Sequence, residues 1–131
     1  MTDQARNGTV VGVIGLGNAG YSVASAFAKL SPVHGYDLNG DKRTSASQGG
    51  IITHDQFDAF MAAIDVAILS LPHPDISLAV TGQLLDLESR PKLIIDTSTV
   101  TPQTAIDCAS LTSPYGVGFV DAAIAGGVAS M

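Results

Sequence analysis

The sequence predicts an α/β fold in which one doubly wound parallel sheet carries helices on both of its faces. Three observations lead to this expectation. Short apolar runs rich in β-branched residues, typical of buried parallel strands, recur along the chain. Segments with helical spacing of apolar residues separate these runs, and such alternation is typical of parallel sheets. Polar residues and glycines follow the runs, at the ends where parallel sheets bind ligands.

Length and composition limit what the chain can be. Its 131 residues suffice for a single domain with its own core, which we expect at residues 9–131 after a loose stretch at residues 1–8. The net charge is −6 with only 6 basic residues, which argues against nucleic acid as a partner because phosphate contacts need clustered Lys or Arg. The one cysteine, Cys108, excludes an intrachain disulfide framework and fits a cytoplasmic location. The three histidines lack the spacing of metal ligands, so we expect no metal site.

The first strand lies in an almost uncharged stretch, which a secretory signal peptide or a membrane span would also explain. The stretch "TVVGVIGLGNAGYSVASAFAKL" (residues 9–30) is rich in glycine, and each glycine inside a helix costs about 1 kcal/mol relative to alanine. The run "TVVGVI" is β-branched, and the apolar spacing becomes helical only after "GLGNAG". A strand, a glycine turn and a helix therefore account for this stretch better, and we predict no membrane association. The helix residues expected to point inward are Val23, Ala26, Phe27 and Leu30.

The glycine turn has the spacing G-x-G-x-x-G, which is typical of dinucleotide-binding loops. Gly15 permits the tight turn, Gly17 lets a pyrophosphate approach the backbone, and Gly20 lets the helix pack closely on the strand. The free N–H groups and the positive dipole end of the helix would then bind the phosphates. The residues that we assign to cofactor binding are consecutive: Gly15, Leu16, Gly17, Asn18, Ala19 and Gly20.

The second strand ends in the acidic residue that such a loop requires. The segment "PVHGYDLNG" (residues 32–40) places Asp37 at the end of the strand. A carboxylate there accepts hydrogen bonds from the adenosine ribose and repels a 2′-phosphate, so Asp37, with Leu38 beside it, favours NAD over NADP. Two alternatives stay open. Asp37 is also an ordinary residue to open the turn "DLNGDK", and Lys42 and Arg43 could reach a 2′-phosphate.

The rest of the chain continues the alternation. Further strands are predicted at residues 49–53, 65–72, 92–99 and about 117–121. Helices are predicted at residues 54–64, from Pro74 to about Leu87, and from Pro102 after an N-cap at Thr101. The side chains expected to point inward are Phe57, Phe60, Met61 and Ile64 in the first of these helices, Ile76, Val80, Leu84 and Leu87 in the second, and Ala105, Ile106 and Ala109 in the third. We predict that Cys108 is a small packing residue rather than a nucleophile.

Four motifs in this order resemble those of the β-hydroxyacid dehydrogenase family, which includes 3-hydroxyisobutyrate dehydrogenase and relatives of 6-phosphogluconate dehydrogenase. They are the loop "GLGNAGYSVA", the strand "AILSLPHPD", and the segments "DTSTVTP" and "FVDAAIAGG". Together they span nearly the whole chain. The resemblance implies a Rossmann-type, doubly wound parallel sheet that binds NAD.

The resemblance also implies roles for individual residues. Those near the nicotinamide ribose would be Leu71, Pro72, His73 and Thr99. Those at the carboxylate of a small-molecule substrate would be Ala125, Gly126 and Gly127. Ala125 stands where the family has serine, so one hydrogen-bond donor to that carboxylate is missing. Ser98 is a further candidate to face the substrate, and its alternative role is to cap the helix that follows.

The activity implied by the resemblance is hydride transfer between a small 3-hydroxy acid and NAD. The family's catalytic Lys and Asn belong to a later helical domain, whereas all three lysines of this chain precede "FVDAAIAGG". We therefore assign no catalytic residue and expect a truncated cofactor domain that binds dinucleotide weakly and does not turn over. The apolar surface of such a fragment would favour a homo-oligomer.

Two other functions stay open. A non-catalytic NAD-binding module for sensing or assembly would also lack the lysine. A methyltransferase likewise combines a glycine loop with an acid after the second strand, but it does not explain "DTST" or "FVDAAIAGG".

Overall fold

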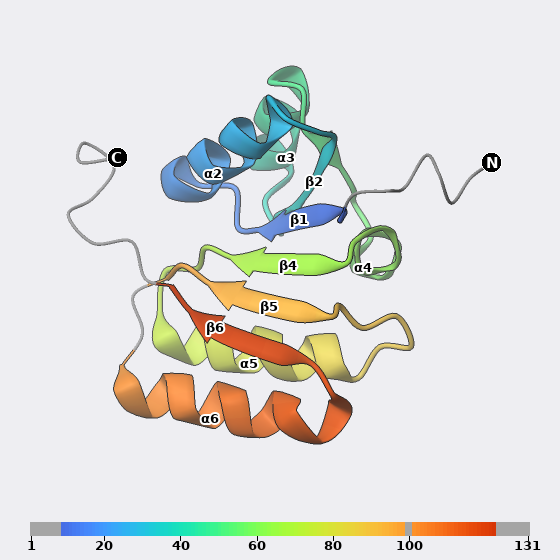
Figure 1. Ribbon diagram of the computed structural model, residues 1–131. Helices are drawn as coiled ribbons and strands as arrows, with labels where there is room; N and C mark the ends of the chain where they lie inside the picture. Colours follow the sequence, from blue (N-terminus) through green and yellow to red (C-terminus); the bar gives the residue numbers. More distant parts are fainter. Residues whose placement is uncertain (1–8, 99–100, 123–131) are drawn as a thin grey trace.

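The computed structural model describes residues 9–98 and 101–122 of the chain. In this part six parallel strands form one sheet in the order β3-β2-β1-β4-β5-β6 (Figure 1). The strands are β1 (Val11–Ile14), β2 (Val33–Tyr36), β3 (Ile52–Thr53), β4 (Val66–Leu69), β5 (Leu93–Asp96) and β6 (Gly118–Asp121). The predicted doubly wound parallel sheet is therefore confirmed, although several strands are shorter than expected.

Helices cover both faces of this sheet (Figure 1). They are α2 (Asn18–Ala28), α3 (Gly40–Gln48), α4 (Phe57–Ala63), α5 (Pro74–Leu85) and α6 (Pro102–Thr112), followed by the short 3₁₀ helix η1 (Ser113–Tyr115). Neighbouring residues of β1 face opposite sides, because side chains alternate along a strand. Val13 packs in a cluster with Ala24 of α2, and Ile14 packs in a cluster with Phe60 of α4 and Leu84 of α5. No helix in the described part of the chain is long and apolar enough to cross a membrane.

Helix α3 is the one described helix of more than one turn that the sequence analysis missed, because we interpreted its start as a turn. The side chain of Asn39 caps it by accepting hydrogen bonds from the backbone N–H groups of Asp41 and Lys42. Ala46 is its one buried residue. A helix with so little apolar surface shows no hydrophobic period, and its capping residue was the only available signal.

The inward faces of α2 and α6 agree with the predicted ones only in part. Val23 and Phe27 of α2 pack against the core as predicted. Leu30, predicted inward, is 85% exposed, and Ala26 is exposed as well. Gly20 and Ala24 are the buried residues of α2. In α6, Ile106 is 58% exposed and Ala109 is exposed, while Cys108 and Thr112 are buried. In both helices the buried residues are small ones.

In helix α5, two of the buried positions lie one residue after positions that were predicted to point inward. Ser77 and Thr81 are fully buried, whereas Ile76 and Val80, predicted inward, are partly exposed. Small side chains at these positions let α5 lie close to α6, where the equally buried Cys108 forms a hydrogen bond with Thr81. Burial raises the pKa of the Cys108 thiol, which suits the predicted packing role and opposes that of a nucleophile.

One matched pair of substitutions tests these burial assignments. Leu84→Ala removes a side chain that is completely buried and should lower the free energy of unfolding by about 2–5 kcal/mol. Leu30→Ala removes a side chain that is 85% exposed and should change that free energy by less than about 0.5 kcal/mol. Urea unfolding followed by circular dichroism measures both. Equal losses in the two variants would contradict the burial of Leu84 and the exposure of Leu30.

Candidate functional site

The carboxyl ends of β1, β2 and β4 meet at one edge of the sheet. From β1 the chain continues to β2 on one side and only later reaches β4 on the other, so the strand order reverses at β1. Ligands of open α/β sheets bind at such a reversal. Backbone hydrogen bonds extend the ladder past the strand ends there: Gly15 N–H donates to the Tyr36 carbonyl at 2.9 Å, and Ser70 N–H donates to the Ile14 carbonyl at 2.8 Å.

Two glycines are required by the turn between β1 and α2. Gly15 has a φ of +98°, in the region that side chains disfavour, and a Cβ there would collide with the Ser70 carbonyl oxygen. A Cβ on Gly20 would collide with the Gly15 carbonyl oxygen. The tight turn expected of Gly15 and the close helix packing expected of Gly20 are both present.

Gly17 differs from the other two glycines, because the protein itself does not require it. It is the N-cap of α2 and has an ordinary φ of −70°. Within 4 Å of a Cβ placed on it, the nearest side-chain or backbone atom is Lys42 Nζ at 3.9 Å. No side chain caps the first turn of α2. The space above Gly17 and the first N–H groups of α2 are therefore available to a ligand.

Asp37 follows β2 and holds the glycine turn in place. Its Oδ2 accepts a hydrogen bond from the Leu16 N–H at 2.7 Å, and its Oδ1 accepts one from the Asn39 N–H at 2.9 Å. The predicted turn-opening role is thus observed. Because each carboxylate oxygen can accept a second hydrogen bond, Asp37 retains acceptor capacity for a ligand.

The two basic residues of α3 differ in what they contact. The Arg43 guanidinium donates to the carbonyl oxygens of Asp37, at 2.7 Å, and Leu38, at 3.2 Å. It therefore holds the chain that follows β2. Lys42 has no such bond among the described residues and lines the pocket at the glycine turn.

A pocket of about 580 Å³ lies at this edge of the sheet, between the glycine turn, the end of β2 and the first turns of α5. Its polar part contains Asn18 and Ser70 and two charged side chains, those of Asp37 and Lys42. The larger side chains of its apolar part are those of Ile14, Tyr36, Leu38, Phe57, Leu71, Pro72, Ile76 and Val80. Leu38 is 88% exposed and adds apolar surface to the pocket.

Half of the predicted site residues line this pocket: Gly15, Gly17, Asn18, Ala19, Asp37, Leu38, Leu71 and Pro72. Leu16 and Gly20 are buried beneath the turn. His73 is the exposed N-cap of α5 and does not line the pocket. Thr99, Ala125, Gly126 and Gly127 lie outside the described residues.

Ser98 connects the ends of β4 and β5 and does not line the pocket. Its side chain is 6% exposed, and its Oγ accepts a hydrogen bond from the Leu71 N–H at 2.7 Å. Its own N–H donates to Asp96 Oδ1 at 2.9 Å. The side chain that caps α6 is that of Thr101, as predicted. Ser98 therefore holds the loop that carries Leu71.

Sequence reasoning missed most of the apolar wall. Tyr36 precedes Asp37 on the same strand, and Phe57 was expected only as a core residue of α4. Ile76 and Val80 were assigned to the core but line the pocket. The signal was the helical spacing itself, which identifies an apolar stripe but cannot tell whether a core or a ligand will cover it.

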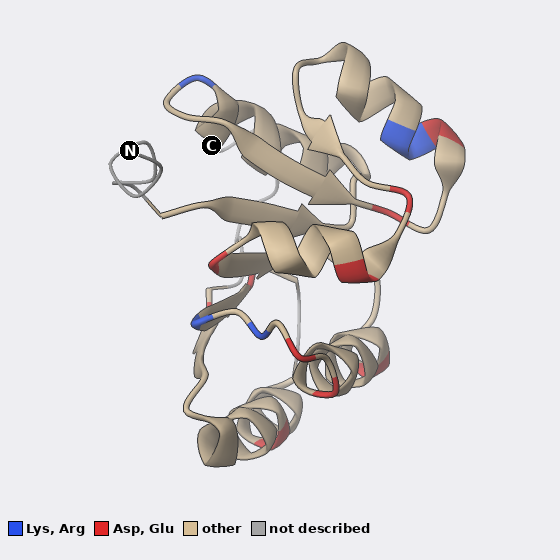
Figure 2. Cartoon of the chain, turned by 90° about the vertical axis from the view of Figure 1, so that its right-hand side faces the viewer, with Lys and Arg blue, Asp and Glu red and all other residues tan. Residues whose placement is uncertain are grey.

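Charge over the rest of the described chain is dispersed. Figure 2 shows basic and acidic positions interspersed on this side of the molecule, with no basic patch.

Solved structures with the same architecture include several oxidoreductases. A Mycobacterium tuberculosis 3-hydroxyisobutyrate dehydrogenase with L-serine is 28% identical, with a TM-score of 0.83 over 92% of this chain and 42% of that chain. A putative oxidoreductase from Mycobacterium avium 104 is 27% identical, with a TM-score of 0.83 over 94% of this chain and 44% of that chain. A reductive aminase from Aspergillus terreus in complex with NADPH is 23% identical, with a TM-score of 0.70 over 85% and 39% of the two chains, and shares the fold. This chain thus spans about two fifths of the length of these proteins.

The family model agrees with this architecture. No curated protein is similar enough to this chain to count as a relative. The model of the NAD-binding domain of 6-phosphogluconate dehydrogenase matches residues 10–131, which include the glycine turn, Asp37 and all six strands. The chain therefore belongs to the family of 6-phosphogluconate dehydrogenase NAD-binding domains.

Proposed function

We propose that this chain is the cofactor-binding part of an oxidoreductase that transfers hydride between a small 3-hydroxy acid and NAD. One observation carries the proposal: a single pocket joins the open space at Gly17, the carboxylate of Asp37 and an apolar wall. These three features match the pyrophosphate, the ribose and the adenine of a dinucleotide.

The pyrophosphate would lie against the first turn of α2. There the chain offers N–H groups that no side chain caps, at the positive end of a helix dipole. The absence of a Cβ at Gly17 leaves room for phosphate oxygens to approach the backbone. Lys42 Nζ lies beside this space and adds a positive charge.

The adenosine would lie beyond Asp37. The remaining lone pairs of its carboxylate would accept hydrogen bonds from the ribose hydroxyls. The adenine ring would pack between the exposed Leu38 and the side chains of Phe57, Ile76 and Val80. Covering these apolar surfaces would contribute to affinity through the hydrophobic effect.

Asp37 is the reason to propose NAD rather than NADP. A 2′-phosphate would lie next to this carboxylate and be repelled by it. Arg43, the residue best suited to bind a phosphate in bidentate fashion, already donates to the carbonyl groups of Asp37 and Leu38. Lys42 is the remaining cation in this pocket among the described residues.

The proposed substrate class follows from the 28% identical 3-hydroxyisobutyrate dehydrogenase and from the motif resemblance. The bound dinucleotide would supply the nicotinamide ring that exchanges hydride with the substrate. Ser98 would support this end of the site by holding Leu71. Of the three lysines, Lys42 lines the pocket near the turn, and Lys92 precedes β5 at the opposite edge of the sheet. We therefore propose that the proton acceptor for the hydroxyl group belongs to a segment beyond this chain.

Substitution of Gly17 separates ligand binding from folding. Gly17→Ser keeps a residue that is favourable at an N-cap, so the free energy of unfolding should change by less than about 0.5 kcal/mol. The added side chain occupies the proposed phosphate space, and the Kd for NAD should rise about tenfold or more. Calorimetric titration and thermal unfolding measure the two effects.

Gly82→Ser is the matched control, because Gly82 lies on α5 with open space around it and does not line the pocket. We expect its affinity for NAD to stay at the wild-type value. Wild-type affinity in Gly17→Ser would contradict the proposed position of the pyrophosphate.

Substitution of Asp37 tests the choice of cofactor. Asp37→Asn removes the charge that repels a 2′-phosphate, so the ratio of the Kd for NADP to the Kd for NAD should fall about tenfold. Asp107→Asn, which makes the same change on α6 away from this pocket, should leave the ratio unchanged. Titration of each variant with both dinucleotides gives the ratios. Binding of NADP to the wild-type chain at least as tight as NAD would overturn the role of Asp37.

Turnover by the isolated chain tests where the proton acceptor lies. We expect the 131-residue chain to bind NAD without producing NADH from any small 3-hydroxy acid, since no lysine of the chain is placed to take the hydroxyl proton. Absorbance at the NADH band, with saturating NAD and a panel of 3-hydroxy acids, is the measurement. Sustained NADH production would show that the chain contains its own proton acceptor.

A further inference from the structure

Two histidines from different elements form a hydrogen-bonded pair near the nucleotide pocket. His34 Nδ1 lies 2.8 Å from His54 Nε2. The ring centroids are 5.1 Å apart and the ring planes differ by 20°. With the nitrogens so much closer than the centroids, the rings meet edge to edge, nitrogen to nitrogen. The pair therefore has the geometry of one N–H···N hydrogen bond.

A series of aromatic contacts leads from this pair to the nucleotide pocket. The His54 ring packs edge-on against Phe60 with centroids 5.9 Å apart, and Phe60 packs against Tyr36 at 5.8 Å. Tyr36 in turn contacts Phe57 at 5.2 Å. Tyr36 and Phe57 both line the pocket, and Phe60 is completely buried between them and the histidines. A shift of His54 would therefore be transmitted through packed rings.

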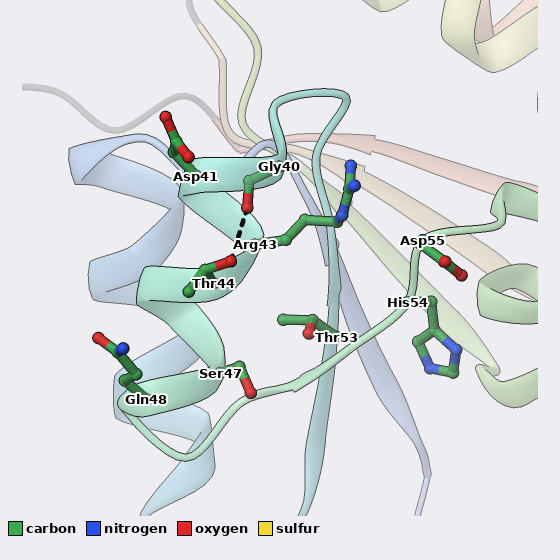
Figure 3. A pocket seen from close by; sticks show the side chains of 9 residues that line it. All are labelled: Gly40, Asp41, Arg43, Thr44, Ser47, Gln48, Thr53, His54 and Asp55. Carbon is green, nitrogen blue, oxygen red and sulfur yellow. Dashed lines mark hydrogen bonds between the residues drawn. The ribbon is translucent and has the colours of Figure 1, made fainter.

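Few other interactions hold His54 in place. It follows β3, an edge strand of two residues that pairs with β2 only at His34↔Ile52 and Gly35↔Thr53. Its backbone N–H donates to the Gly35 carbonyl at 3.3 Å. His54 also borders a surface pocket of about 680 Å³ between α3 and the segment after β3, so water can reach it (Figure 3). The imidazole hydrogen bond is thus a large part of what fixes this segment.

This hydrogen bond depends on the number of protons on the pair. With both rings neutral, one nitrogen donates and the other accepts. One added proton leaves a charged donor and a neutral acceptor, so the bond persists. A second proton turns both facing nitrogens into donors and places two positive charges next to each other, which breaks the bond.

Burial opposes a positive charge on His34. Burial and, to a lesser extent, the nearby His54 lower the pKa of His34 below its usual value near 6.5. The charged groups nearby are Asp55, which follows His54, and Asp41 and Arg43, which line the same surface pocket on α3. Since the unfolded chain binds the proton more readily than the folded chain, the contribution of His34 to stability is present above about pH 6.5 and is lost as the pH falls below it.

We propose that the His34–His54 hydrogen bond is a proton-sensitive clamp that fixes Tyr36 and Phe57 in the nucleotide pocket, so that double protonation weakens nucleotide binding. The regulation rests on the proposed function, because it acts on the pocket assigned to adenosine. It makes nucleotide affinity depend on pH through residues that do not touch the nucleotide.

The pH dependence of ADP-ribose binding tests this clamp. ADP-ribose contains the adenosine and the pyrophosphate but no nicotinamide, and unlike AMP it has no phosphate monoester that titrates near pH 6. For the wild-type chain we expect the Kd, measured by calorimetry, to be roughly fivefold higher at pH 5.0 than at pH 7.5. His54→Gln keeps a hydrogen-bonding side chain that does not titrate, so its two Kd values should agree within about twofold.

His73→Gln is the control, because His73 is the one other histidine of the chain and lies outside the aromatic series. Whatever its absolute affinity, this variant should keep the wild-type ratio of the two Kd values. An equal ratio in His54→Gln and wild type, or a ratio lost in His73→Gln, would overturn the clamp.

A measurement without ligand distinguishes failure of the clamp from failure of the proposed function. In NMR spectra of the free wild-type chain, the ring protons of Tyr36 and Phe57 should shift when the pH falls from 7.5 to 5.0, and these shifts should be absent in His54→Gln. No shift at Tyr36 or Phe57 in the wild type, or equal shifts in His54→Gln, would refute the clamp even if nucleotide binds. If ADP-ribose binds at neither pH, the proposed function fails, and the NMR titration still decides whether the clamp exists.

Discussion

The close approach of α2 to the end of β1 is the constraint on which the rest of the site depends. The chain turns at Gly15 with a positive φ, and the helix then passes so near that Gly20 lies against the Gly15 carbonyl group. A side chain at either position would force the helix away from the sheet. Because the approach is this close, the first N–H groups of α2 lie at the edge where the strands end, and Gly17 remains open to a ligand.

Hydrogen bonds to backbone groups then join the neighbouring strand ends to this turn. Asp37 accepts from Leu16 N–H and so connects the end of β2 to the glycine turn. Ser98 accepts from Leu71 N–H and connects the end of β5 to the segment after β4. Each of these side chains fixes a loop, and Asp37 also keeps hydrogen-bonding capacity for a ligand. The family match and this arrangement agree on a domain that binds a pyridine nucleotide.

A feature of the fold or of the site could be predicted from the sequence where a few consecutive residues were enough to indicate it. Glycine spacing, apolar runs and Pro102 after Thr101 reflect backbone requirements of a few consecutive residues, and they identified the turn, the strands and the cap of α6. Helix α3 had no apolar stripe and was missed. The inward faces of α2, α5 and α6 were partly wrong, because close packing selected small residues such as Ala24, Ser77 and Cys108 over larger apolar neighbours.

The sequence by itself therefore determined the six strands, the helices other than α3 and η1, the dinucleotide-binding turn and the acid at the end of β2, because these follow from short-range chain geometry. Only the tertiary structure decided which apolar side chains became core and which became the pocket wall. Ile76 has helical spacing like a core residue, yet α5 turns it toward the nucleotide edge, whereas Val80 packs against the core and also lines the pocket. The pairing of His34 with His54 also arises only when β2 and β3 lie side by side, since the two residues are 20 positions apart in the chain.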